Sequence, residues 1–179
     1  MKVTLLMAQT LDGKIAKDAD HFPDWTGPED KKLFVKLTKH AGCLIMGSKT
    51  YDTIGRPLPG RKNVIMTRQK EKLEVNSYEL GEIENDGKTG LIYTNSSPKE
   101  ILEYLEKAGF EEVILAGGAV INTLFIKENL IDKIVVTISP LIFGEGIAMF
   151  DESVSLELEL DDLEQISKDV VCVKYKVIS

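Results

Sequence analysis

Short apolar runs alternate with amphipathic segments along the chain, and this alternation carries most of the structural information in the sequence. Each run is rich in Val, Ile, Leu or Met and has the length of a buried strand. The predicted strands are residues 3–7, 44–46, 64–66, 112–115 and 134–143. Because helical segments separate the strands, the pattern predicts an α/β fold with a mainly parallel central sheet.

The segment 28–40 has the pattern of an amphipathic helix. Leu33, Phe34 and Leu37 recur with the spacing of one helix face. Pro28 suits the first helical turn, where its missing N–H leaves no hydrogen bond unmade. We therefore expect a helix here, with its apolar face against the sheet.

Three further helices are predicted. Ser97 and Glu100 form a capping-box pattern that opens a helix to about residue 107. A short helix is expected after Gly47, up to residue 54, and another over 119–126, after a pair of glycines.

The last quarter of the chain breaks this alternation. Residues 155–178 have the pattern of two strands around a polar turn near 167–169, which predicts an antiparallel hairpin at one edge of the sheet. The sequence contains no internal repeat, low-complexity tract or linker. We therefore expect residues 1–179 to form a single domain, with a twisted sheet flanked by helices.

Composition narrows the class of protein. The 179 residues are 43% hydrophobic and 28% charged, as is typical of soluble globular proteins. The net charge of −7 argues against a nucleic-acid partner, because nucleic-acid binding requires clustered positive charge. No apolar run approaches the ~18 residues of a membrane span.

The cysteines and histidines indicate no metal site. Cys43 and Cys172 lie among apolar residues, as buried free thiols do in proteins of the reducing cytosol. His21 and His40 are isolated along the sequence. We therefore expect a cytoplasmic protein with no metal, no membrane contact and no nucleic-acid partner.

Ligands of such sheets bind beyond the carboxyl ends of the strands, so the residues after each predicted strand are the candidates for a site. Asp12-Gly13 forms a turn after the first strand and opens a polar segment, residues 12–25, that is long enough to be a lid. After the second strand, Gly47 and the following helix N-terminus favour an anion. Lys49 and Thr50 add a charge and a hydroxyl there.

Two prolines and two glycines give the loop 54–63 an irregular, rigid path. This loop presents Arg61 as a planar fork for a carboxylate. Thr67 and Arg68 follow the third strand and offer another hydroxyl and guanidinium. A glycine pair at 117–118 suits close approach of a pyrophosphate, although the three-glycine dinucleotide fingerprint is absent.

Asp30 is the candidate catalytic carboxylate. It lies in the first turn of the predicted helix, with Leu33 and Phe34 three and four residues later. A carboxylate beside an apolar face can manage a proton near neutral pH. The simpler interpretation is a charge that satisfies the helix dipole, and position alone favours it.

The segment from Trp25 to Arg68 closely resembles bacterial dihydrofolate reductase. Trp25 precedes Asp30 by five residues, and the proline and glycine spacing of loop 55–63 is the most specific part of the match. The other matching positions are Phe34, Thr38, Ile45, Met46, Gly47, Lys49, Thr50, Thr67 and Arg68. The resemblance extends more loosely to the first strand and to 115–120, and so covers most of the chain.

This resemblance implies a dihydrofolate reductase-like fold and NADPH-dependent reduction of 7,8-dihydrofolate to tetrahydrofolate. The hydride would go to C6 and the proton to N5, with Asp30 as the essential carboxylate that anchors the pterin and aids protonation through water. The implied substrate-binding residues are Leu6, Ala8, Asp30, Phe34, Ile54, Leu58, Arg61 and Thr137. The implied cofactor-binding residues are Ala8, Ile15, Gly47, Ser48, Lys49, Thr50, Met66, Thr67, Arg68, Leu115, Gly117, Gly118, Ala119 and Val120. A monomer or a homodimer is expected.

Two segments resemble a sister family, the pyrimidine reductases of riboflavin biosynthesis, which share the fold and NADPH. They are residues 11–16 and 139–146. Ser48 also stands where dihydrofolate reductases usually have arginine. The alternative functions are therefore reduction of a ribosylamino-pyrimidine phosphate, or nucleotide or pterin binding without catalysis. The stretch 57–61 favours dihydrofolate, because pyrimidine reductases generally lack it.

Overall fold

The computed structural model describes residues 1–76 and 90–178. The ten strands in this part of the chain are β1 (Lys2–Thr10), β2 (Lys14–Ala16), β3 (Cys43–Gly47), β4 (Lys62–Met66), β5 (Gly90–Thr94), β6 (Glu112–Leu115), β7 (Lys133–Ser139), β8 (Ile147–Ala148), β9 (Glu157–Gln165) and β10 (Val171–Ile178). The helices are α1 (Gly27–Ala41), α2 (Ser48–Ile54), α3 (Lys70–Asn76), α4 (Pro98–Lys107) and α5 (Ala119–Lys127).

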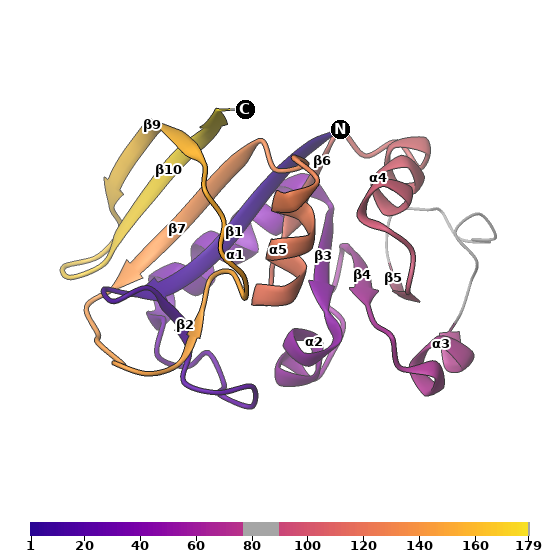
Figure 1. The fold of residues 1–179 in the computed structure, drawn as a ribbon, viewed down its shortest axis with the longest axis horizontal. Helices are drawn as coiled ribbons and strands as arrows, with labels where there is room; N and C mark the ends of the chain where they lie inside the picture. Colours follow the sequence, from indigo (N-terminus) through magenta and orange to yellow (C-terminus); the bar gives the residue numbers. More distant parts are fainter. Residues whose placement is uncertain (77–89, 179) are drawn as a thin grey trace.

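Eight strands form one twisted sheet in the order β5-β4-β3-β6-β1-β7-β10-β9 (Figure 1). The pairs from β5 to β7 are parallel, whereas β10 pairs antiparallel with both β7 and β9. The α/β class, the mainly parallel sheet and the antiparallel C-terminal hairpin are therefore confirmed.

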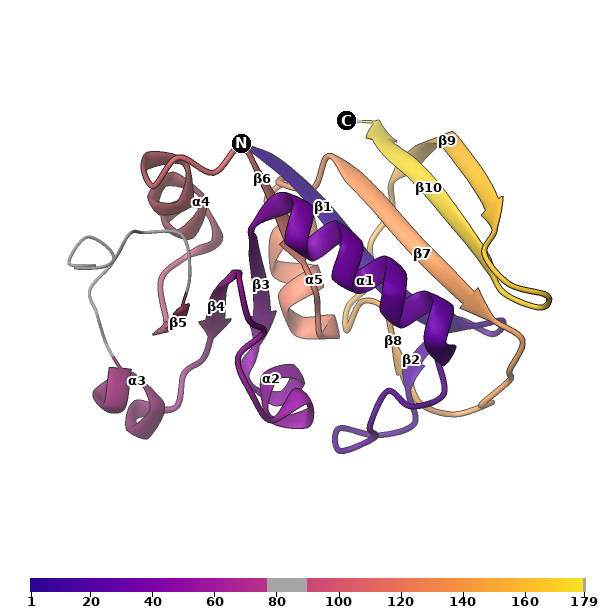
Figure 2. The ribbon, with the colours of Figure 1, turned by 180° about the vertical axis from the view of Figure 1, so that it is seen from behind.

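Helices cover both faces of the sheet, and the alternation of side chains along the strands separates two apolar layers. Phe125 of α5 and Leu105 of α4 pack with Leu5 of β1 in one layer, and all three are fully buried. Leu33 and Leu37 of α1 pack against the other layer, and Figure 2 shows α1 lying across that face. Full burial of a side chain such as Phe125 contributes about 1.5–3 kcal/mol to folding.

Several elements differ from the predicted pattern. β7 ends at Ser139, not at residue 143, because Pro140 cannot donate the next ladder hydrogen bond. The apolar residues that follow, Ile142 and Phe143, belong to a loop over 140–146. The pattern did not predict β5, α3 or the small β2–β8 pair.

The predicted capping box at the start of α4 is present. Ser97 Oγ accepts a hydrogen bond from Glu100 N, and Glu100 Oε2 accepts one from Ser97 N. We expect Ser97→Ala to lower the free energy of unfolding by about 1 kcal/mol. Urea denaturation would measure this loss, with Ser96→Ala as the neighbouring control. An unchanged midpoint would show that the cap contributes nothing.

Within the described ranges 1–76 and 90–178, no helix is long and apolar enough to cross a membrane.

Candidate active site

The carboxyl ends of β1, β3, β4 and β6 lie along one edge of the sheet, the lower edge in Figure 1. This follows from parallel pairing, which places like ends of neighbouring strands together. The predicted site segments after these four strands therefore lie along the same edge of the sheet.

Asp30 and Thr137 come from distant parts of the chain and form a hydrogen bond, with Thr137 Oγ1 donating to Asp30 Oδ1. Thr137 is completely buried in β7, where it pairs with Ala8 of β1. The Asp30 side chain is half-buried, and its Oδ2 accepts no hydrogen bond from another residue in the described part of the chain. A carboxylate placed in this way can accept N–H groups from a ligand ring.

Apolar side chains extend from Asp30 toward the loop after α2. Phe34 of α1, together with Ile54 and Leu58, is partly buried against the α1-side core layer. Asn63 holds the loop in place: its Oδ1 accepts from Leu58 N at 2.9 Å, and its Nδ2 donates to Leu58 O at 3.0 Å. This role of Asn63 was not predicted from the sequence. Its place at the end of a loop with two prolines was the signal that the sequence offered.

Arg61 lies at the far end of this apolar strip and is only 3% exposed. Its Nη1 donates to Thr38 Oγ1 at 2.8 Å, and its Nε donates to Pro59 O at 3.1 Å. Burial lowers the pKa of the guanidinium below its ordinary value. No carboxylate of the described residues forms an ion pair with it. A buried cation without an acidic partner favours an anionic ligand.

Glycines form a cradle between the N-termini of α2 and α5. Gly47 N donates to Gly117 O at 2.8 Å. Gly47 and Gly118 are the N-cap residues of the two helices, and neither helix has a side-chain cap. A Cβ on Gly118 would lie 3.3 Å from Thr50 Oγ1, and one on Gly47 would lie 3.0 Å from Ile121 Cγ1. Uncapped amides on such a close backbone fit the pyrophosphate of a dinucleotide.

Cations and hydroxyls surround the cradle. Lys49 and Arg68 are exposed, whereas Ser48 is half-buried. Thr67 is 6% exposed, and its Oγ1 accepts from Gln69 N at 3.1 Å. These residues come from the ends of the neighbouring strands β3 and β4, so the structure brings them to one side of the site.

The remaining predicted residues divide by burial. Ala8 and Ile15 are half-buried at the end of β1 and in β2. Val120 is 49% exposed on α5. The others are core residues beneath the strand ends, and their contact with a ligand stays a prediction. They are Leu6, Met66, Leu115 and Ala119.

Three aromatic rings, from the lid segment before α1 and from the loop after β7, pack together. Trp25 and His21 both pack edge-on against Phe143, with ring centroids 5.2 and 5.4 Å away. Phe143 belongs to the segment predicted as strand, so its contact with the lid segment had no signal in the local pattern. Within residues 1–76 and 90–178, no cluster of three or more His, Cys, Asp or Glu could hold a metal.

Comparisons with known proteins identify the family. The model of the RibD C-terminal domain matches residues 1–172. The riboflavin biosynthesis protein RibD of Aquifex aeolicus is 29% identical over 94% of this chain, which spans 56% of that protein. The dihydrofolate reductase of Bacillus subtilis is 34% identical over 68% of this chain and 60% of its own length. The chain thus spans little more than half of each of these two relatives.

Among solved structures, a putative riboflavin biosynthesis protein from Shewanella sp. PV-4 superimposes with a TM-score of 0.76 at 24% identity, and each chain is fully covered. This likeness supports the fold. The similarity to dihydrofolate reductase is a relation of fold and of partial sequence, so the predicted assignment to that family is corrected. The chain belongs to the RibD C-terminal domain family.

Proposed function

We propose that this chain is an NADPH-dependent reductase that acts on a ribosylamino-pyrimidine phosphate. The observation that carries the proposal is the Asp30–Thr137 pair, held on the β7 side of a glycine cradle that fits a dinucleotide. Membership of the RibD C-terminal domain family supports this substrate class over a pterin.

In this proposal Asp30 anchors the substrate ring. Thr137 occupies Oδ1, which leaves Oδ2 to accept N–H groups of an aminopyrimidine. NADPH supplies the hydride when it is bound. The chain contributes orientation, exclusion of water by the apolar strip around Phe34, and a carboxylate that accepts hydrogen bonds beside the ring.

The cradle and its basic rim are the proposed cofactor site, with Lys49 and Arg68 facing the phosphates. We expect Lys49→Ala to raise the KM for NADPH by about tenfold, because a charge-assisted contact with a phosphate is lost. The effect is limited to this size because solvent partly screens an exposed charge pair. The KM for NADH should change little if Lys49 serves the 2′-phosphate. Steady-state rates with both cofactors measure this. Lys39→Ala, exposed on α1, is the control. Equal changes for both cofactors would contradict the assignment.

A second candidate substrate is dihydrofolate, because its glutamate tail would bring a carboxylate to Arg61. Arg61 is a buried guanidinium without an acidic partner among the described residues, at the far end of the apolar strip from Asp30. A carboxylate at the end of a long substrate would complete this site. A phosphate would also satisfy the charge, so Arg61 is compatible with both candidates.

The two substrates are separated by assay. Consumption of NADPH is followed with the ribosylamino-pyrimidine phosphate and, in parallel, with dihydrofolate, and the products are identified by mass spectrometry. Reduction of the pyrimidine supports the proposal. Binding of NADPH without reduction of either substrate would instead indicate a catalytically idle member of the fold.

A further inference from the structure

The carboxylate of Asp12 joins two loops that are far apart in sequence. Its Oδ1 accepts hydrogen bonds from Thr10 Oγ1 at 2.5 Å and from Phe143 N at 3.2 Å. Its Oδ2 accepts from Gly144 N at 2.7 Å. Asp12 lies in the turn after β1, whereas Phe143 and Gly144 lie in the loop after β7. One side chain therefore connects the start of the lid segment to the opposite loop.

These bonds favour the ionised carboxylate. Hydrogen bonds from Thr10, and then from the amides of Gly144 and Phe143, hold the pKa of Asp12 below its ordinary value. The described residues give Asp12 no ion pair, so the connection depends on hydrogen-bond geometry. The Asp12 carboxylate is therefore ionised, and able to accept these hydrogen bonds, throughout the neutral pH range.

The loop that Asp12 holds also carries the aromatic contact to the lid segment. Phe143 packs against Trp25 and His21, and Lys17 Nζ lies 5.2 Å from the centre of the Phe143 ring. Trp25 is followed five residues later by Asp30, the proposed substrate anchor. Fixing the backbone of Phe143 therefore fixes the surface on which Trp25 rests.

The same two segments meet again at the β2–β8 pair, where Lys14 is opposite Ala148 and Ala16 is opposite Ile147. Gly146 has a φ of +144°, and a Cβ there would lie 2.4 Å from Ala16 O. Only glycine allows this approach. The turn after β1 and the loop after β7 are therefore packed together along their length.

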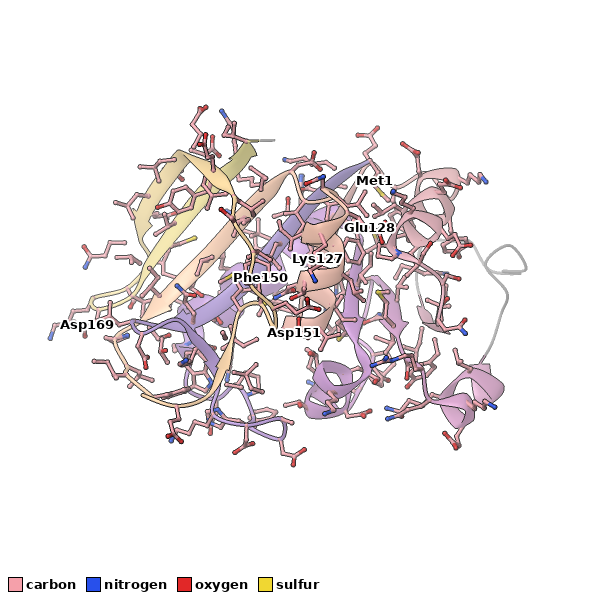
Figure 3. All side chains as sticks on the ribbon, viewed as in Figure 1. Met1, Lys127, Glu128, Phe150, Asp151 and Asp169 are labelled. Carbon is pink, nitrogen blue, oxygen red and sulfur yellow. The ribbon has the colours of Figure 1, made fainter. Side chains whose placement is uncertain are left out.

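The chain that follows this loop and β8 is anchored on α5, the helix that begins at the glycine cradle. Met149 O accepts from Asn122 Nδ2 at 2.8 Å, and Asp151 N donates to Thr123 Oγ1 at 3.0 Å. Figure 3 shows Phe150 and Asp151 beside Lys127 of α5. Because this end is fixed, a change at Asp12 is expected to move the lid segment rather than the loop.

We propose that Asp12 is a positioning residue that holds the lid segment, residues 12–25, against the loop 140–146, and so keeps Ile15 and Trp25 in place over the reaction site. The part of Asp12 in the reaction rests on the proposed function. The connection itself does not, because it can be measured without cofactor or substrate.

The test uses Trp25, the only tryptophan of the chain, as a fluorescent reporter. Asp12→Asn keeps the size of the side chain but turns one oxygen into an NH₂ that faces a backbone N–H. In the ligand-free protein, we expect the fraction of molecules in which the lid segment has left the loop 140–146 to rise by about tenfold, as loss of a charge-assisted hydrogen bond predicts. In these molecules acrylamide reaches Trp25 and quenches its fluorescence. Phe143→Leu, which leaves Asp12 intact, should expose Trp25 in the same way.

Asp18→Asn is the matched control, because Asp18 lies in the same segment and its carboxylate accepts only the local Asp20 N, at 3.0 Å, within the described chain. If the protein reduces the proposed substrate, Asp12→Asn should lower kcat by about tenfold while substrate KM changes less than about twofold. Unchanged quenching in a folded Asp12→Asn variant, or an equal change in Asp18→Asn, would overturn the proposal. Altered quenching without any reductase activity would sustain the connection and reject the proposed function instead.

Discussion

Replacing Asp30 with asparagine is expected to lower the turnover number by at least about 10²-fold at neutral pH, in the range for loss of an acid–base group. Asparagine preserves the volume of the side chain but removes its charge. Its amide also has only one acceptor atom, because the second polar atom is an NH₂ donor. The side chain can therefore no longer accept from the Thr137 hydroxyl with one atom and from a ring N–H with the other. Steady-state oxidation of NADPH with saturating substrate measures the loss.

The control for this experiment is Asp24→Asn, which removes an exposed carboxylate from the segment before α1. Its turnover should stay close to that of the unmodified protein. Thr137→Val is a second variant, because it removes the hydroxyl that orients Asp30 and keeps the carboxylate. Near-normal turnover of a folded Asp30→Asn protein would show that Asp30 is the helix-dipole charge that its position alone suggests.

The second large effect is expected at Arg61. Arg61→Ala should weaken binding of an anionic substrate by about 2–3 kcal/mol, which is roughly 30- to 150-fold in affinity. The large value follows from burial, because a guanidinium that is 3% exposed is poorly solvated and gains more from an anion than a surface arginine does. The substrate KM, or a dissociation constant from titration, gives the measurement.

Arg56→Ala provides the control, since Arg56 lies in the same loop and is exposed. Arg61→Lys keeps the charge without the planar fork and should fall between the two. Thermal melting of each variant separates lost binding from lost folding, because Arg61 also bonds Thr38 and Pro59. An unchanged KM for dihydrofolate in Arg61→Ala would reject dihydrofolate as a glutamate-tailed ligand of this site.

Much of the fold could be predicted because local patterns and tertiary structure agree there. The apolar runs became the central strands, and the 28–40 pattern became α1, one residue longer at each end. β5 was not predicted, because Gly90–Thr94 has only two consecutive aliphatic residues. The β2–β8 pair is fixed by contact between distant loops, which no local window contains.

In the candidate site, too, local motifs could be predicted from the sequence, whereas contacts between distant segments could not. The Trp25 to Asp30 spacing and the loop before Arg61 identified residues that the structure places along α1, where Asp30 bonds Thr137 and Thr38, eight residues later, bonds Arg61. The Asp12 contacts with Phe143 and Gly144 span 131 and 132 residues, so periodicity carries no trace of them. Local motifs also gave undue weight to dihydrofolate reductase, because the most specific ones lie within 25–68, whereas the family assignment rests on 1–172.

The comparison of two specificity constants tests the central claim most directly. One preparation of the protein is given NADPH and either the ribosylamino-pyrimidine phosphate or dihydrofolate, and kcat/KM is measured for each. We predict NADPH oxidation with the pyrimidine phosphate at a higher kcat/KM than with dihydrofolate, and its loss in Asp30→Asn. Efficient reduction of dihydrofolate with no reduction of the pyrimidine phosphate would contradict the proposed function.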